Sequence, residues 1–430
     1  MTLALRTSRR HLLTALAGLG VAGALSSRST GQEDTNSEYR DTISVLAPVA
    51  PDPAPPDAET DLDLGLEFWQ ERNRARINLE SAALENIRPK ILMNFQRGAH
   101  LHDVMYCAGW AQEIAQHLHP VDALLGPGTR ADISPWAFNS FRWQGKTYGV
   151  PIVSNPFILF GNRTLLNTAG IDNLPSTWDE LISAARAVHL SGKIGWAMPA
   201  GQIGGLGGLF SSWQVFFLQA GGELFDPDGR PLFASDAGIA AIQMLQELLP
   251  YSDPAALRRV SLLDASVPML HGEAALMANW AVMYRSFSNP ALSRISDSVI
   301  TAPLPDGPIG TASIDSGDGW TIDIRTWVAG KSMSYIRFLL EPRTQLHLYA
   351  RSGWLPASLS ALDDEALLAV APHAQAVRQQ VRHRIESGFR PDFDAVSAVI
   401  GTAVRSALTD GVAPITALRT ARDQIARAAR

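Results

Sequence analysis

Several tryptophans stand where a predicted strand or helix ends, and these indoles are the side chains best suited to bind a ligand. Eleven tryptophans occur in the 430 residues. A sugar presents apolar C–H faces and a rim of hydroxyls, so its binding needs flat aromatic rings and a few amide or carboxylate partners. The indoles at element ends are Trp110, Trp213, Trp280, Trp320 and Trp354. For any one of them alone, packing in a core or between lobes explains the residue equally well.

Two His-x-His pairs, His100/His102 and His117/His119, are the other candidates for chemistry. Alternate residues of a strand share a face, so such a pair could bind a metal ion. No third ligand follows at a characteristic spacing, and solvated or capping histidines explain the pattern better. The Gly-rich run 202–208 lacks the Lys-Ser/Thr of a phosphate loop, and no nucleophile elbow occurs. We therefore predict no cofactor, no metal site and no enzymatic activity.

Apolar periodicity predicts the elements that must carry these residues. Strand, helix, strand, helix and strand follow one another at 42–48, 62–74, 77–82, 83–97 and 102–107. This order predicts a mostly parallel sheet covered on both faces. The Pro-rich stretch 48–56 predicts a loop at the carboxyl end of the sheet, where α/β folds bind ligands. Cys107, the lone cysteine, falls in the third strand and is expected to be a small buried residue.

The stretch 141–188 organises the chain. Its polar turn at Gln144-Gly145 predicts a hairpin. Pro151 cannot donate to a sheet ladder, so its strand is expected at a sheet edge or at a passage between two sheets. Thr177 is expected to cap a helix with acidic residues in its first turn, where the backbone dipole favours negative charge.

This order of motifs resembles the extracellular solute-binding proteins of ABC importers, in the branch that includes the maltose-binding protein. Chains of that family carry a Gly-Lys-x-Tyr-Gly-Val-Pro turn and strand, a Leu-Phe-x-Asn strand end, an Ala-Gly and a Pro-x-Thr-Trp-Asp-Glu-Leu helix start. These motifs appear here at 145–151, 159–162, 169–170 and 175–181. The resemblance runs from about residue 42 to the C-terminus and is weakest before residue 100 and at 322–331.

The resemblance implies an α/β fold of two lobes around a ligand cleft, the type II periplasmic binding protein fold, with hinge crossings between the lobes. The crossings are expected at Gly149–Asn155, at Thr301–Pro305 and between Glu341 and Pro356. The expected N-lobe is 41–150 with about 303–345, and the expected C-lobe is 151–302 with about 346–430. The implied function is capture of a sugar, oligosaccharide or polyol by hinge closure, and its delivery to the transmembrane subunits of an ABC permease.

The resemblance and the indole positions together imply a ligand site of six residues. Trp280 ends the strand that commonly supplies a stacking aromatic in this family. Trp110 follows the third strand at the expected edge of the cleft. Asp318 lies where the family brings a Gly-rich backbone to the ligand. The other members of the set are Asn155, Trp213 and Trp354.

Composition and charge set the broad class. The chain is 46% hydrophobic and 18% charged, which suits a globular protein with a sizeable core. Its net charge of −6 gives no support to nucleic-acid binding. Two other functions stay open at this point, a secreted carbohydrate-active enzyme and a sensor that presents its ligand to a receptor. The enzyme would need a pair of acids set for glycoside chemistry, and the sequence does not point to one.

The N-terminus has the pattern of a targeting segment. Arg9-Arg10 precedes a short apolar run, and 1–25 matches a twin-arginine secretory signal. The run is too short for a comfortable membrane span, and no cysteine follows it for a lipid anchor. The alternative is an uncleaved N-terminal anchor. We expect 26–40 to be a flexible linker and the mature protein to be a monomer in the periplasm.

Replacing Arg9 and Arg10 with lysine should block export, because the twin arginine is the recognised feature of such a signal. Precursor is then expected to accumulate in the cytoplasm. Fractionation and immunoblotting of the two forms measure the effect, and normal periplasmic accumulation of the double variant would contradict the twin-arginine route.

Overall fold

The computed structural model describes residues 41–48, 61–200, 204–205, 208–258, 262–386, 390 and 392–428. The expected signal, the linker and most of the Pro-rich stretch lie outside these residues. The chain divides into two compact units. Unit 1 comprises the described parts of Met1–Asn155, Ser316–Ala371 and Ser387–Arg390. Unit 2 comprises those of Pro156–Asp315, Pro372–Glu386 and Pro391–Arg430.

Unit 1 is built on a five-stranded sheet with the order β2-β1-β3-β13-β6. Its strands are β1 (Asp41–Pro48), β2 (Ala75–Ala82), β3 (Val104–Ala108), β6 (Gly149–Pro151) and β13 (Asp318–Ile322). The first three strands are parallel, whereas β13 runs antiparallel to both of its neighbours. The edge position of β6 confirms what Pro151 predicted. The parallel strands leave their carboxyl ends together at one edge, which we call the carboxyl edge.

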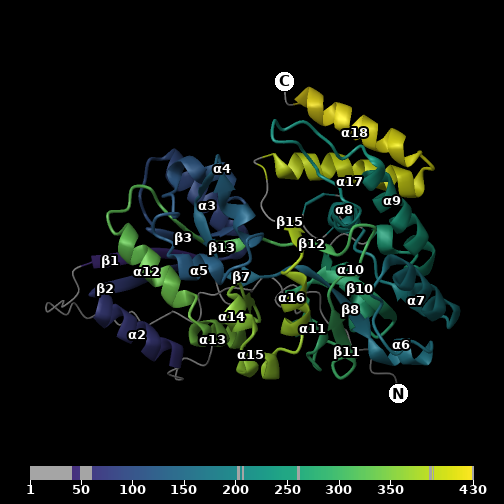
Figure 1. Cartoon of the computed structure of the whole chain (residues 1–430), viewed down its shortest axis with the longest axis horizontal. Helices are drawn as coiled ribbons and strands as arrows, with labels where there is room; N and C mark the ends of the chain where they lie inside the picture. Colours follow the sequence, from purple (N-terminus) through teal and green to yellow (C-terminus); the bar gives the residue numbers. More distant parts are fainter. Residues whose placement is uncertain are drawn as a thin grey trace, which may run out of the picture. The chain divides into compact units, whose positions relative to one another are not determined.

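Helices cover both faces of this sheet. In Figure 1, α3 lies above the sheet, against β1 and β3, and α2 lies below it, against β2. The helices of unit 1 are α2 (Asp61–Asn73), α3 (Leu84–Gln96), α4 (Ala111–Ile114), α5 (Pro127–Ala131), α12 (Ala329–Leu339), α13 (Pro342–Ser352), α14 (Leu359–Leu362) and α15 (Glu365–Val370), with 3-10 turns at Ala115–His117 and Ala137–Phe141. Two short strand pairs complete it, β4 (Arg142–Trp143) with β5 (Lys146–Thr147), and β7 (Val153–Ser154) with β14 (Leu355–Pro356).

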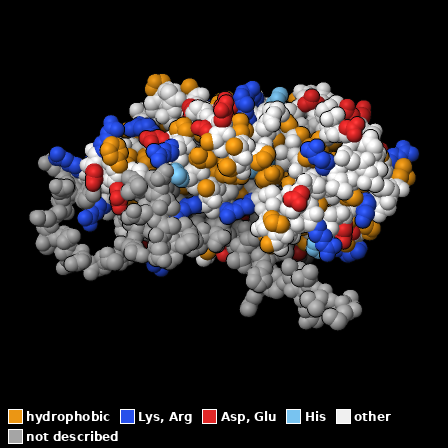
Figure 2. All heavy atoms as spheres, turned by 90° about the horizontal axis from the view of Figure 1, so that it is seen from below, with side chains coloured by type: hydrophobic (Ala, Val, Ile, Leu, Met, Phe, Trp, Pro, Cys, Tyr) orange, Lys and Arg blue, Asp and Glu red, His pale blue; other side chains and the backbone are white. Residues whose placement is uncertain are grey.

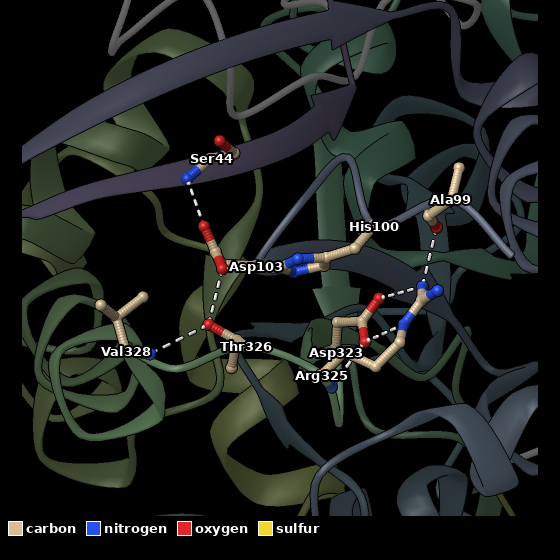
Figure 3. A network of polar contacts seen from close by, with 8 residues as sticks. All are labelled: Ser44, Ala99, His100, Asp103, Asp323, Arg325, Thr326 and Val328. Carbon is tan, nitrogen blue, oxygen red and sulfur yellow. Dashed lines mark hydrogen bonds and ion pairs between the residues drawn. The ribbon is translucent and has the colours of Figure 1, made fainter.

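A polar network fixes the loop after β13 at the edge opposite the carboxyl edge (Figure 3). The carboxylate of Asp103 accepts hydrogen bonds from the backbone N–H of Ser44, at 2.8 Å, and from the hydroxyl of Thr326, at 2.5 Å. The guanidinium of Arg325 donates to both carboxylate oxygens of Asp323, at 3.0 and 2.7 Å. It also donates to two backbone carbonyls, one of them Ala99. This network satisfies two buried carboxylates and so anchors the C-terminal end of β13.

Unit 2 is built on a four-stranded sheet with the order β11-β8-β10-β9. Its strands are β8 (Phe157–Asn162), β9 (Ile194–Trp196), β10 (Ala274–Trp280) and β11 (Val299–Ala302). β10 runs antiparallel to β8 and parallel to β9. Every residue of β8 and β10 is buried, and both central strands are apolar except for Asn162 and Asn279. A second small sheet pairs β12 (Ala312–Ile314) with β15 (Arg384–Glu386).

The helices of unit 2 surround that sheet. They are α6 (Arg163–Thr168), α7 (Trp178–Leu190), α8 (Leu209–Gln219), α9 (Asp236–Leu248), α10 (Leu262–Leu270), α11 (Tyr284–Phe287), α16 (Ala374–Gln380), α17 (Phe393–Thr409) and α18 (Pro414–Ala428), with 3-10 turns at Leu249–Tyr251, Ala256–Arg258 and Ala281–Met283. The last two helices lie side by side and pack on α8 and α9, as Figure 1 shows in yellow. All eleven residues of α8 are buried, so this helix is the core of the layer.

Local signals in the sequence are confirmed in both units. The hydroxyl of Thr177 accepts from the backbone N–H of Glu180 and so caps α7. Gln144 and Gly145 have φ angles of 47° and 77°, as a tight turn between β4 and β5 requires. Cys107 is buried, and burial raises the pKa of its thiol. None of the described helices is long and apolar enough to cross a membrane.

The boundaries between the two units differ from the expected lobes. The first passage falls at the Asn155–Pro156 bond, within one residue of the expected stretch. The second falls at Asp315–Ser316, not at 301–305, because β12 stays in unit 2 by pairing with β15.

The third passage also lies later than expected, at Ala371–Pro372 rather than before Pro356. Residues assigned to the C-lobe from 346 onward remain in unit 1, because β14 pairs with β7 and Ser358 donates to the Asp132 carboxylate. No local pattern in the sequence indicated these long-range contacts.

Acid should destabilise the protein partly through His373. Its ring is 1% exposed and stacks on Tyr284, with ring centroids 4.2 Å apart. Burial lowers its pKa from 6.5 to about 3. The folded state therefore binds fewer protons than the unfolded state, so stability falls as the pH drops below about 6.5, by at most about 1.4 kcal/mol per pH unit.

The variant His373→Phe keeps an aromatic ring against Tyr284 and removes the titration. Between pH 7 and pH 4.5 its free energy of unfolding should fall less than that of the wild type. Urea unfolding at several pH values measures the difference. If the free energy of unfolding changes with pH in the same way for the wild type and the variant, His373 does not contribute to the loss of stability in acid.

Candidate functional site

Four of the six predicted ligand residues meet at the carboxyl edge of unit 1. Trp110 follows β3 after one residue, Gly109, and is half-buried. Asp318 opens β13 opposite Ala108, the last residue of β3. Asn155 follows β7, and Trp354 precedes β14, the strand that pairs with β7. The carboxyl ends of strands are where open α/β sheets place ligand-binding groups, so this cluster is the candidate site of unit 1.

Asp318 is the centre of the cluster. One carboxylate oxygen accepts a hydrogen bond from the phenol of Tyr106, and the other accepts from the hydroxyl of Ser316. The residue is 6% exposed, and no basic side chain among the described residues forms an ion pair with it. Burial raises the pKa of this carboxyl, although the two hydrogen bonds favour the charged form. Asp318 is thus a buried acid held by neutral donors.

An aromatic group stands beside this acid. The ring of Tyr106 stacks on Trp354, with centroids 5.9 Å apart and planes 19° apart. Trp320, the cross-strand partner of Tyr106, meets the same ring edge to face at 6.0 Å. Trp320 is fully buried, whereas Trp354 keeps 5% of its surface exposed. Trp354 is therefore the indole of this group that can offer a face to a ligand.

Asn155 and Ser316 join the two strands by which the chain leaves and re-enters unit 1. The side-chain amide of Asn155 donates to the hydroxyl of Ser316 at 3.5 Å. The turn behind Ser316 needs glycine at 317, where φ is +71°. A Cβ there would lie 2.4 Å from the hydroxyl oxygen of Ser140. The backbone conformation that Gly317 permits therefore sets the position of Ser316.

Trp280 is the candidate residue of unit 2. It ends β10 opposite Phe157, the first residue of β8. The two rings meet edge to face, with centroids 4.4 Å apart. The indole is 7% exposed, and the backbone N–H of Trp280 donates to the side-chain oxygen of Asn279. The exposed part of the Trp280 ring is available to a ligand, while the rest of the ring packs inside unit 2.

Trp213 does not belong to a ligand surface. It lies in the middle of α8 and is 0% exposed. Its indole stacks on Phe217 at 4.6 Å, and its N–H donates to the carbonyl of Gly238. Phe233 meets the ring edge to face. The helix periodicity of the sequence did not separate this core position from an element end, because α8 is buried on all sides, its polar residues included.

Two residues of the cluster were missed at the sequence level, Tyr106 and Ser316. A strand tyrosine needs a partner for its hydroxyl when it is buried, which was an available signal for Tyr106. Ser316 opens the run Ser-Gly-Asp-Gly, where only Asp318 was singled out. Their pairing through one carboxylate needs β3 and β13 side by side, which the sequence did not show.

The histidine pairs have ordinary partners. The ring of His102 contacts the carboxylate of Glu80 at 2.7 Å, and that of His100 lies 3.4 Å from Asp103. The ring of His117 stacks on Phe95. Within the described ranges, no three His, Cys, Asp or Glu side chains are grouped so as to hold a metal ion.

The molecular surface carries a mixture of charges. On the face drawn in Figure 2, acidic and basic side chains are interspersed, and neither sign forms a continuous field. A nucleic-acid-binding face would gather lysine and arginine. This face therefore offers no electrostatic footprint for such a partner.

Comparison with protein families gives a match over most of the chain. The model for bacterial extracellular solute-binding proteins matches residues 64–345. A probable amino-acid ABC transporter periplasmic-binding protein of Sinorhizobium fredii is 27% identical over 242 residues, which are 55% of this chain and 53% of that protein. A probable ABC transporter-binding protein of Deinococcus radiodurans is 23% identical over 380 residues, 84% of this chain and 89% of that protein. The chain thus spans about half of the first relative and most of the second.

Sugar- and polyol-binding proteins are among the solved structures with the same fold. The sugar-binding protein MalE of Xanthomonas citri matches with a TM-score of 0.75 at 21% identity, over 89% of this chain and 96% of that one. A solute-binding protein of Agrobacterium radiobacter in complex with ribitol matches with 0.66 at 19% identity, over 90% and 99%. One of Agrobacterium vitis with bound D-mannitol matches with 0.63 at 18% identity, over 90% and 98%. At these identities the likeness establishes the fold.

Truncating the core indole Trp213 to alanine should lower the free energy of unfolding by about 3–5 kcal/mol, because the change leaves a cavity in α8. Trp327→Ala is the matched control. This indole is 76% exposed, so its loss should change stability by less than about 0.5 kcal/mol. Denaturant unfolding compares the two, and equal effects would contradict the packing role of Trp213.

Proposed function

This chain belongs to the bacterial extracellular solute-binding proteins of ABC transporters, and we propose that its own solute is a sugar, an oligosaccharide or a related polyol. The observation that carries the proposal is the cluster at the carboxyl edge of unit 1, where indole rings stand beside a buried carboxylate. The solved relatives that bind maltose, ribitol and mannitol support the choice of ligand class.

The chemistry of the cluster suits a polyhydroxylated ligand. Trp110 and Trp354 supply aromatic surface for the C–H face of a sugar, and Asn155 supplies an amide for its hydroxyls. Trp280 of unit 2 would supply a second stacking ring. Asp318 forms no ion pair among the described residues, and its buried negative charge would disfavour an anionic solute.

The mechanism we propose is closure of the two units on the ligand. The chain passes between them at Asn155–Pro156, Asp315–Ser316 and Ala371–Pro372, and again on either side of Ser387–Arg390. The first three of these passages would serve as hinge segments. A ligand that contacts groups of both units favours the closed state, because only differential contacts shift the population. The closed form is what the transmembrane subunits of a permease would recognise.

Export completes the proposal. The twin-arginine signal expected at 1–25 would carry the protein to the periplasm as a monomer. Catalysis is no part of the proposal, because the matched family and the curated relatives are transport binding proteins.

A thermal-shift screen over sugars, polyols and amino acids tests the ligand class. At about 100 times its dissociation constant a true ligand adds about 2.7 kcal/mol of stability. We expect a response to a sugar or polyol, and a response to amino acids alone would overturn the proposed class. Turnover of a labelled glycan during the incubation would instead indicate an enzyme.

Trp280→Ala should weaken binding of the ligand so found by more than tenfold, because truncating a stacking aromatic commonly costs about 2 kcal/mol of binding or more. The variant should also lose stability, since the indole packs on Phe157. Titration calorimetry on the folded protein separates the two effects. Trp213→Ala is the matched control, whose affinity should stay unchanged when measured below its unfolding transition. Equal affinity of Trp280→Ala and wild type would remove Trp280 from the site.

A further inference from the structure

A chain of hydrogen bonds in unit 1 leads from the aromatic group to the hinge strands. Tyr106 donates to one oxygen of Asp318, Ser316 donates to the other, and Asn155 donates to Ser316. We call these four residues the polar relay. All its members belong to unit 1, and the phenol at its first end stacks on Trp354.

The other end of the polar relay lies at the two passages of the chain. Asn155 is the last residue of unit 1 before the first passage, and Ser316 is the first residue after the second. Pro156 and Asp315, the next residues on the other side of each passage, form an isolated antiparallel bridge within unit 2. The two hinge strands are therefore joined on both sides of the passages. A bridge joins them in unit 2, and in unit 1 they are joined by the side-chain bond from Asn155 to Ser316 and by the backbone bond from Ile152 to the Asp318 carbonyl.

The strength of these bonds is uneven. The bonds at Asp318 involve a carboxylate that is 6% exposed, and charge-assisted bonds of this kind are the strong ones. The amide of Asn155 lies 3.5 Å from the hydroxyl of Ser316, at the outer limit for a hydrogen bond. The link between the hinge strands is thus the weakest of the relay and the first to change when the strands move.

Hydrogen bonds hold the backbone at Asp318 and Gly317, so the side chains of the polar relay have more freedom to move than the main chain. The carbonyl of Asp318 accepts from the N–H of Ile152 at 3.1 Å, and the carbonyl of Gly317 accepts from the N–H of Gly109 at 2.9 Å. Tyr106 and Ser316 both donate to the one carboxylate of Asp318, one to each oxygen.

We propose that Asp318 is a positioning residue that couples the ring surface at Trp354 to the two hinge strands through Tyr106 and Ser316. This inference rests on the proposed closure of the two units. Asp318 then acts on the ligand indirectly, by setting the preferred angle of the hinge, and Ser316 carries that effect to Asn155.

The test uses the full chain without ligand. Spin labels are attached at Lys146→Cys in unit 1 and Lys193→Cys in unit 2, two exposed positions, while the buried native Cys107 stays unlabelled. Pulsed electron resonance then gives the distribution of distances between the labels. Removal of the hydroxyl in Ser316→Ala should change the ratio of the populated distances by about fivefold, the effect of losing one net hydrogen bond.

Three further variants make the result specific. Ser316→Thr keeps a hydroxyl and should restore the wild-type distribution. Tyr106→Phe removes the other donor to Asp318 and should reproduce the change of Ser316→Ala. Ser313→Ala also removes a buried serine bond close to the second passage, but it lies outside the polar relay and should leave the distribution unchanged.

An unchanged distribution in Ser316→Ala, or the same change in Ser313→Ala, would overturn the coupling. So would a wild-type distribution in Tyr106→Phe, since the relay would then not extend to the ring surface. None of these outcomes involves ligand, so they are distinct from failure of the ligand screen, which bears on the solute class alone.

Discussion

The antiparallel pairing of β13 between β3 and β6 is the constraint on which the rest of unit 1 depends. β13 belongs to the segment that returns to unit 1 after Pro156–Asp315, the long middle part of the chain, which lies in unit 2. The register places Asp318 opposite Ala108, at the carboxyl edge. Because that edge also receives Trp110, one strand pairing both completes the core and assembles the candidate site.

A buried carboxylate at such an edge is expensive unless it is satisfied. Asp318 receives two donors from its own unit, Tyr106 and Ser316, and so retains a fixed orientation. The same bonds leave the phenol of Tyr106 held flat against Trp354, which preorganises the aromatic surface. Preorganised rings lose little entropy on binding, a property that a receptor for hydroxylated solutes needs.

Two tryptophans of unit 2, Trp213 and Trp280, have different structural roles. In unit 2 the fully buried α8 packs Trp213 among phenylalanines, while Trp280 ends a strand and keeps part of its ring accessible. The sequence pattern at both positions is an indole in an apolar run. Only the packing of the neighbouring helices tells them apart, because a helix surrounded on all sides has no exposed end to offer.

The sequence by itself determined the features that depend on near neighbours. The cap at Thr177, the turn at Gln144-Gly145 and the edge position of Pro151 follow from hydrogen bonding and backbone sterics within a few residues. The ordered motifs also indicated the family and the two-unit α/β fold. Tertiary structure alone decided where the chain crosses between units and which residues surround Asp318. Tyr106 and Asp318 lie 212 positions apart, and no local pattern encodes a contact whose geometry is set by the register of a distant strand.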